Sequence, residues 1–220
     1  MDHVIKIGGS LVEHIEKFKE LIAKLEEYFQ VKKFALITGG GELADVVRKY
    51  YQEYSLSETT AHWMAITTQN MLAKIVNALI KRKSVLINHL TQIDNLLSTQ
   101  IPIIEPLNIL KKNDDLPHSW DVTGDAIAIY VAKKINAKNV ILLKDVDGLF
   151  SDYGNTDPVQ LVKSVHIDEL SKLEISPIDK HSLQLLKDSN INCWLVNGFE
   201  PSRILDILEG KDTICTKILS

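Results

Sequence analysis

The sequence predicts an α/β fold, a three-layer αβα sandwich on a mainly parallel β-sheet. Short apolar runs alternate along the whole chain with longer segments whose apolar residues recur at helical spacing. Two of these runs, 3–7 and 33–38, lead directly into glycine turns, and a third, 139–143, ends in charged residues. Because parallel strands place their carboxyl ends at one edge of a sheet, we expect a ligand site at that edge.

The overall composition favours small-molecule partners. The 220 residues carry 29 acidic and 25 basic side chains without a basic block, which disfavours nucleic acid and anionic membranes as partners. Cys193 and Cys215 lie in separate apolar runs, as is typical of buried free thiols rather than of a disulfide or a metal site. With neither a signal peptide nor a membrane span in the sequence, we expect a cytoplasmic protein folded as one domain over residues 1–220.

The first strand ends in a turn suited to a phosphate group. Gly8 and Gly9 allow an anion to approach the backbone, and Ser10 would cap the next helix. Lys6 would act as a point charge on a transferring phosphoryl group. An ordinary turn has the same composition, and neither the G-x-G-x-x-G nor the G-x-x-x-x-G-K-[ST] motif occurs, so the interpretation depends on motifs in the rest of the chain.

A second glycine turn comes directly after the strand at 33–38. It contains Gly39, Gly40 and Gly41, and a purely structural turn seldom needs three glycines, which favours close approach of a ligand. The long helix predicted over 56–82 carries His62 near its start. Together with the neighbouring tryptophan and methionine, this histidine is more typical of a core or subunit contact than of substrate binding.

The polar loop 113–121 leads into a helix that begins at Gly124. The helix dipole explains a single carboxylate in a first helical turn. It does not explain Asp121, Thr123 and Asp125 at alternating positions beside a loop that carries His118 and Trp120, and we interpret this cluster as the wall of a site.

Further strands are predicted at 84–87 and 101–104, and the fifth strand, 139–143, ends in the charged segment 144–150, where α/β sheets bind ligands. An irregular excursion over 151–165 comes next, interpreted as a small hairpin. The rest of the chain predicts a helix starting at 176–180, a strand at 192–196, a helix at 201–208 and a last strand at 213–218.

Taken in order, these motifs resemble the amino acid kinase family over essentially the entire chain. The similar blocks are IKIGGS at 5–10, TGGGELAD at 38–45, VTGDAIA at 122–128, LLKDVDGLF at 142–150, the lysine at 180 and NGFEPSRIL at 197–205. The resemblance implies an ATP-dependent kinase, with an acceptor-binding half at about 1–136 and a nucleotide-binding half at about 137–220. It also implies Mg²⁺ held mainly by the ATP phosphates, with no protein metal ligands.

The resemblance assigns roles to individual residues. Lys6 would contact the transferring phosphoryl group, Lys180 would neutralise charge on the ATP side, and Asp125 would orient both lysines. The acceptor would be held by Gly39, Gly40 and Gly41. The other ATP-binding residues would be Gly8, Gly9, Ser10, Lys144, Asp145, Asp147, Gly148 and Phe150.

The block PHSWDVT at 117–123 most resembles an archaeal and methylotroph branch of the family. That branch includes a kinase of methanofuran biosynthesis, which phosphorylates [5-(aminomethyl)furan-3-yl]methyl phosphate with ATP, so the resemblance implies this acceptor. The triple-glycine turn could hold its phosphate with His118 nearby, Trp120 could face the furan, and Asp121 could pair with the ammonium.

Other functions stay open. The acceptor could instead be uridylate, isopentenyl phosphate or an amino-acid carboxylate, and the chain could be a nucleotide- or oxyanion-binding assembly without catalysis. Lys6, Asp125 and Lys180 together favour catalysis, because a pure binder does not need this combination. The resemblance also implies a homo-oligomer, for which the 56–82 helix would provide a suitable contact.

Overall fold

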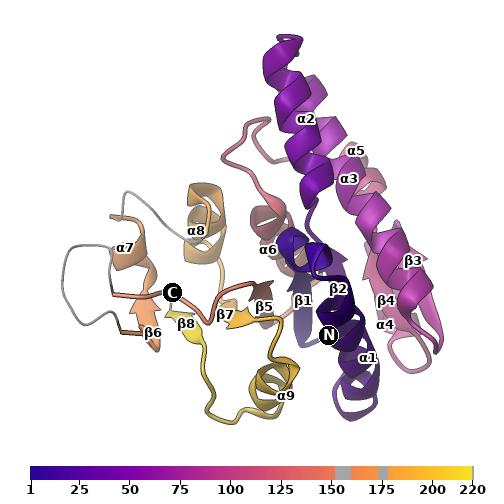
Figure 1. Cartoon of the computed structure of the whole chain (residues 1–220), viewed down its shortest axis with the longest axis vertical. Helices are drawn as coiled ribbons and strands as arrows, with labels where there is room; N and C mark the ends of the chain where they lie inside the picture. Colours follow the sequence, from indigo (N-terminus) through magenta and orange to yellow (C-terminus); the bar gives the residue numbers. More distant parts are fainter. Residues whose placement is uncertain (152–159, 173–177, 220) are drawn as a thin grey trace.

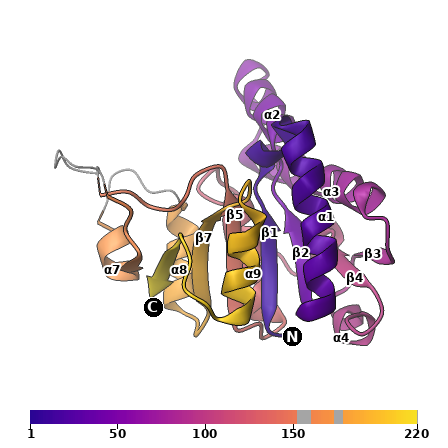
Figure 2. The same cartoon turned by 60° about the horizontal axis from the view of Figure 1, so that its bottom comes forward.

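The computed structural model describes residues 1–151, 160–172 and 178–219, and these form a sheet covered by helices on both faces (Figures 1 and 2). The described strands are β1 (His3–Ile7), β2 (Phe34–Thr38), β3 (Ser84–Ile87), β4 (Ile101–Ile104), β5 (Asn139–Lys144), β6 (Ser164–His166), β7 (Asn192–Asn197) and β8 (Thr216–Leu219). The described helices are α1 (Ile15–Val31), α2 (Glu42–Glu53), α3 (Glu58–Leu79), α4 (Ile93–Leu96), α5 (Pro106–Lys112), α6 (Gly124–Lys134), α7 (Ile167–Leu170), α8 (Lys180–Lys187) and α9 (Pro201–Glu209), with 3₁₀ turns η1 (Gly9–Glu13) and η2 (Leu90–Gln92).

The strands lie in the order β3-β4-β2-β1-β5-β7-β8-β6. Every described pair is parallel except β7 with β8, which confirms the predicted mainly parallel sheet. β1 lies between β2 and β5, and Lys6 is in register with Ile37 on one side and Leu142 on the other. The carboxyl ends of these three strands therefore meet at one edge, as the sequence predicts.

Alternation along β1 divides the core into two layers. Ile5 and Ile7 pack with α1 and α9, which lie on the same face of the sheet in Figure 2. Val4 packs on the opposite face with residues of α5, α6 and α8. Because side chains along a strand alternate between faces, Lys6 lies on the same side as Val4 and faces α6.

α2 and α3 form an antiparallel pair that extends beyond the sheet at its carboxyl edge (Figure 1). α2 begins directly after the triple-glycine turn, and α3 returns along it toward β2. The N-terminal part of α3 therefore lies above the edge where β1, β2 and β5 end.

The start of the first helix differs from the prediction. Gly9–Glu13 forms a 3₁₀ turn, and the α-helix begins only at Ile15. Neither segment has a side-chain cap, so the prediction that Ser10 caps this helix is wrong. The sequence prediction also missed the short elements α5, α7 and β6, which offer too few residues for a clear periodic pattern.

The centre of the predicted hairpin, 152–159, lies outside the described residues. Its flanks pair in antiparallel fashion, with Phe150 bridged to Leu161 and the Ser151 N–H donating to the Gln160 carbonyl at 2.8 Å. Cys193 and Cys215 are free and buried, as predicted, and burial raises the pKa of both thiols. No helix within the described ranges is both long and apolar enough to cross a membrane.

Candidate active site

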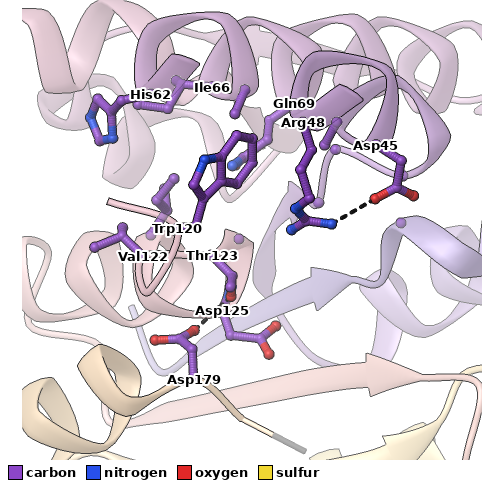
Figure 3. Close-up of a pocket in the computed structure, with 18 of the residues that line it drawn as sticks. Asp45, Arg48, His62, Ile66, Gln69, Trp120, Val122, Thr123, Asp125 and Asp179 are labelled. Atoms are coloured by element: carbon purple, nitrogen blue, oxygen red, sulfur yellow. Dashed lines mark hydrogen bonds and ion pairs between the residues drawn. The ribbon is translucent and has the colours of Figure 1, made fainter. Parts of the chain in front are cut away.

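A cavity of about 450 Å³ opens at the carboxyl edge of the sheet (Figure 3). Its inner end is formed by the two glycine turns, the end of β5 and the start of α6. Its outer walls are α2, one face of α3 and the loop before α6. Residues from the first and the second half of the sequence thus line one cavity of a size that suits a small ligand.

At the inner end, one buried carboxylate holds two lysines. The Lys6 ammonium lies 2.8 Å from Asp125 Oδ1, and the Lys144 ammonium donates to Asp125 Oδ2. Lys6 and Asp125 are 6% and 3% exposed, so water screens this cluster weakly. Two ammonium groups and one carboxylate leave a net positive charge, which suits a bound polyphosphate.

The charge of Asp125 is set by its two partners. Burial alone would raise the pKa of this carboxyl group, but Lys6 and Lys144 together lower it to about 2. Burial lowers the pKa of Lys6, against the opposing effect of Asp125. Asp125 is therefore ionised at neutral pH, and its charge favours the protonated form of Lys6.

The two glycine turns pack directly against each other. A Cβ atom on Gly9 would lie 2.2 Å from the Gly41 nitrogen, and Gly41 has a φ of +56° that favours glycine. The prediction from sequence was close approach of a ligand. In the structure the close approach is between the turns themselves, and it brings both of them to the cavity wall.

A hydrogen-bonded chain joins α6 to α8 beside the lysines. The Thr123 hydroxyl accepts from the Asp125 N–H at 3.2 Å and donates to Asp179 Oδ2 at 2.6 Å. Asp179 in turn caps α8, accepting from the Ser182 N–H and hydroxyl, each at 2.7 Å. Thr123 and Asp179 thus fix the start of α6, and with it the position of Asp125 (Figure 3).

The outer end of the cavity is built differently. The Arg48 guanidinium lies 4.7 Å from the ring centroid of Trp120 and 2.9 Å from Asp45 Oδ1. Trp120 also contacts Tyr51 edge-on, with ring centroids 5.6 Å apart. Glu58, in the first turn of α3, lines the same end, and within the described part of the chain its carboxylate has no ion-pair or hydrogen-bond partner.

Several predicted site residues meet at this cavity, and others do not. Those lining it are Lys6, Gly9, Ser10, Gly39, Gly40, Gly41, Trp120, Thr123, Asp125 and Lys144. Those outside its lining are Gly8, His118, Asp121, Asp145, Asp147, Gly148, Phe150 and Lys180.

The prediction for Lys180 needs correction. It begins α8 with an exposed side chain, and both oxygens of Asp125 pair with other lysines. The second lysine on Asp125 is Lys144, because β5 runs beside β1 and ends next to Lys6. The sequence prediction had placed Lys144 only among the other ATP-binding residues.

The acceptor-loop prediction also changes. Asp121 is exposed and lies outside the cavity lining, whereas its neighbours Trp120 and Thr123 line it. His118 pairs with Asp114 and Thr59 instead of facing the cavity. An irregular loop has no fixed side-chain alternation, so spacing alone could not separate these residues.

The segment DVDG at 145–148 connects the end of β5 to neighbouring elements. Asp147 accepts hydrogen bonds from Asn197 and Arg203, which lower its pKa and tie the segment to β7 and α9. A Cβ atom on Gly148 would lie 2.5 Å from the Thr216 hydroxyl, so this glycine packs against β8.

The contribution of α3 was not predicted from the sequence. Residues at helical spacing on one face line the cavity: Glu58, Ala61, His62, Ala65, Ile66 and Gln69. The signal was present as a stripe of small and polar residues in a helix that otherwise looks like core. His62, assigned to the core or a subunit contact, is buried and also lines the cavity.

Comparison with known proteins finds relatives in sequence and in fold. A sequence model described as "Amino acid kinase family" matches residues 3–197. The [5-(aminomethyl)furan-3-yl]methyl phosphate kinase of Methanocaldococcus jannaschii is 33% identical over 99% of this chain and 97% of its own length. The uridylate kinase of Methanococcoides burtonii is 21% identical over 93% of this chain and 90% of its own length. The uridylate kinase structure from Archaeoglobus fulgidus shares the fold, with a TM-score of 0.78, 22% identity and full coverage of both chains.

Proposed function

Because the chain belongs to the amino acid kinase family, and is thereby an ATP-dependent phosphotransferase, we propose that its acceptor is a small phosphate monoester. The leading candidate is [5-(aminomethyl)furan-3-yl]methyl phosphate, which would be converted to its diphosphate. The observation that carries this proposal is the end-to-end similarity to the Methanocaldococcus jannaschii kinase named for that acceptor.

The cavity offers a partner for each part of such an acceptor. The phosphate would lie by the triple-glycine turn, within reach of Lys6 and Lys144. The furan would pack on Trp120, whose ring faces the cavity and is held by Arg48 and Tyr51. The ammonium would pair with Glu58, the unpaired carboxylate of the outer wall, in place of the predicted Asp121.

The reaction we propose is an in-line transfer. An oxygen of the acceptor phosphate bonds to the γ-phosphorus of ATP while the bond from that phosphorus to the β,γ-bridging oxygen breaks, and ADP leaves. A phosphate monoester has a second pKa of about 6, so this nucleophile is already ionised at neutral pH and needs no general base. Catalysis then consists of positioning and charge stabilisation.

Lys6 and Lys144 would stabilise the charge that develops on the transferring group. Asp125 would favour the protonated form of Lys6 and hold both lysines in place, and it is a positioning residue because it acts through them. Thr123 and Asp179 would support Asp125 from behind.

Mg²⁺ belongs to the proposal as the ion that neutralises the ATP phosphates. The carboxylates at the inner end already have partners: Asp125 has two lysines, and Asp179 has Thr123 and Ser182. These residues fit an ion held mainly by phosphate oxygens, and they do not fit a protein cage.

For the nucleotide side we propose the residues predicted from sequence, except that Lys144 pairs with Asp125. We propose that ATP lies over residues 137–220 and the acceptor over 1–136. The phosphates would approach Gly8, Gly9 and Ser10. The nucleoside side would involve Asp145, Asp147, Gly148, Phe150 and Lys180.

We also propose a homo-oligomer with α3 in the contact. Met71 and Ile75 on α3 are 48% and 43% exposed, which is typical of a helix face covered by a second copy. Light scattering coupled to size-exclusion chromatography would test this, and a monomer at micromolar concentration would contradict it.

The acceptor can be tested by measuring ADP release. The panel would contain the aminomethylfuran phosphate, uridylate, isopentenyl phosphate and N-acetylglutamate, each with ATP and Mg²⁺. We expect the highest kcat/KM for the aminomethylfuran phosphate. A higher value for uridylate would replace it as acceptor, and ATP binding without turnover of any compound would favour the non-catalytic alternative.

A further inference from the structure

Three side chains beside the cavity have no part in the proposed phosphoryl transfer. His62 comes from α3, whereas Asp114 and His118 come from the loop after α5. His62 Nε2 lies 3.0 Å from Asp114 Oδ2, and His118 Nε2 lies 2.9 Å from the same oxygen. The three atoms all lie within 4.8 Å of one another.

We infer that His62, Asp114 and His118 bind one divalent transition-metal ion of the Zn²⁺, Co²⁺ or Ni²⁺ class. Two imidazole nitrogens and one carboxylate oxygen form a donor set that such ions prefer. Mg²⁺ prefers oxygen ligands, so this ion is distinct from the one that accompanies ATP.

The two distances to Asp114 are close to those of ligands that share an ion. Two ligand atoms that each lie about 2.1 Å from an ion are about 3.0 Å apart at right angles and about 3.4 Å apart in a tetrahedron. Asp114 Oδ2 lies 3.0 Å and 2.9 Å from the two nitrogens, so a small side-chain shift would admit the ion. The two imidazole rings are neighbours, with centroids 4.2 Å apart, and both Nε2 atoms lie within hydrogen-bond distance of the same carboxylate oxygen.

The surroundings support these ligands. The Thr59 hydroxyl lies 2.9 Å from His118 Nδ1, where it can accept a hydrogen bond from that nitrogen's N–H and leave Nε2 free for an ion. The Leu116 N–H donates to the other oxygen of Asp114 at 3.2 Å. Trp63 contacts both imidazoles edge-on and shields them on one side.

An ion here would join α3 to the acceptor loop. That loop carries Trp120 and Thr123, and His62 itself lines the cavity. The ion would therefore hold the acceptor wall in place. Three protein ligands also leave at least one coordination position for water or an acceptor atom.

Metal content tests the inference without reading kinase activity. The full-length protein would be stripped with a chelator and dialysed against Zn²⁺ or Co²⁺ in the presence of excess Mg²⁺, without nucleotide. We expect one ion per chain by elemental analysis and a visible absorption band with Co²⁺. Binding should be at least 10-fold weaker in His118→Asn and Asp114→Asn, and unchanged in His89→Asn, an exposed histidine hydrogen-bonded to Lys112.

Two results would overturn the inference: wild-type protein that takes up no stoichiometric ion, or a His118→Asn variant that binds as tightly as wild type. If circular dichroism shows that Asp114→Asn does not fold, the metal binding of His118→Asn decides. The His118 side chain is 30% exposed, so we expect its replacement to leave the fold intact. A failed acceptor assay would leave this measurement untouched, so the two proposals can fail separately.

Discussion

The two ends of the cavity differ in how they hold charge. At the inner end, Lys6 and Lys144 share a buried carboxylate on the carboxyl edge of the sheet. At the outer end, Arg48 and Glu58 are exposed on α2 and α3 around Trp120. Buried charges are costly unless they are paired, so the inner end tolerates little change, whereas the outer end can vary with the acceptor at small cost to the fold.

The largest effect is expected from Asp125→Asn. Loss of this carboxylate leaves two ammonium groups together, one of them buried, which should lower the free energy of unfolding by about 3–5 kcal/mol at pH 7. Urea unfolding would measure it, with Asp45→Asn as the matched control. Asp45 is an exposed partner of Arg48, so its loss should cost no more than about 0.5 kcal/mol.

The same variant has a defined pH dependence. The pKa of Asp125 is about 2 in the folded protein, below its ordinary 3.8, so ionised Asp125 stabilises the fold above pH 3.8. This contribution is lost as the pH falls toward 2. The difference in the free energy of unfolding between wild type and Asp125→Asn should therefore become smaller as the pH falls from 3.8 toward 2. A constant difference would contradict the pairing of Asp125 with Lys6 and Lys144.

Lys144→Gln should have the next largest effect. If Lys144 stabilises the transferring group, kcat should fall by about 10²–10³ with little change in KM. Lys180→Gln is the comparison, and it should mainly raise the KM for ATP. Steady-state kinetics with both substrates varied would measure this. A large loss of kcat in Lys180→Gln with a mild effect in Lys144→Gln would restore Lys180 as the second lysine of transfer.

The position of Lys144 shows where sequence prediction stops. The sequence predicts which strands carry Lys6 and Lys144, because glycine turns and apolar runs mark the strand ends. It does not give the register of β1 against β5, and that register places Lys144 beside Asp125. The inner end was therefore predicted in its parts, but the wrong lysine was paired.

The outer end was harder to predict for a different reason. Trp120 and Asp121 are neighbours in an irregular loop, where no period fixes which side chain faces the ligand. The contribution of Glu58 depends on how α3 packs over the sheet edge, which is a tertiary property. Residues in long regular elements could be placed from the sequence, whereas loop residues and helix faces needed the structure.

Trp120→Ala tests the outer end of the cavity, and we expect a smaller effect than in the two variants above. Loss of the ring removes both the packing against the acceptor and the contact with Arg48. We therefore expect the KM for the acceptor to rise about 10-fold. The free energy of unfolding should change by less than it does in Asp125→Asn. Trp120→Phe keeps an aromatic face and should recover part of the affinity. Equal loss in both variants would argue against stacking.

The smallest effect, and the most specific, is expected from Glu58→Gln. This change removes a charge without altering shape, and an exposed ion pair contributes up to about 1 kcal/mol, so the acceptor KM should rise by about 3- to 5-fold. The rise should appear for the aminomethylfuran phosphate and vanish for the analogue in which the aminomethyl group is a methyl group. Asp121→Asn is the matched control and should leave both values unchanged, because Asp121 lies outside the cavity lining. If Asp121→Asn raises KM while Glu58→Gln does not, the ammonium binds on the loop side, and the outer end is organised as the sequence alone predicted.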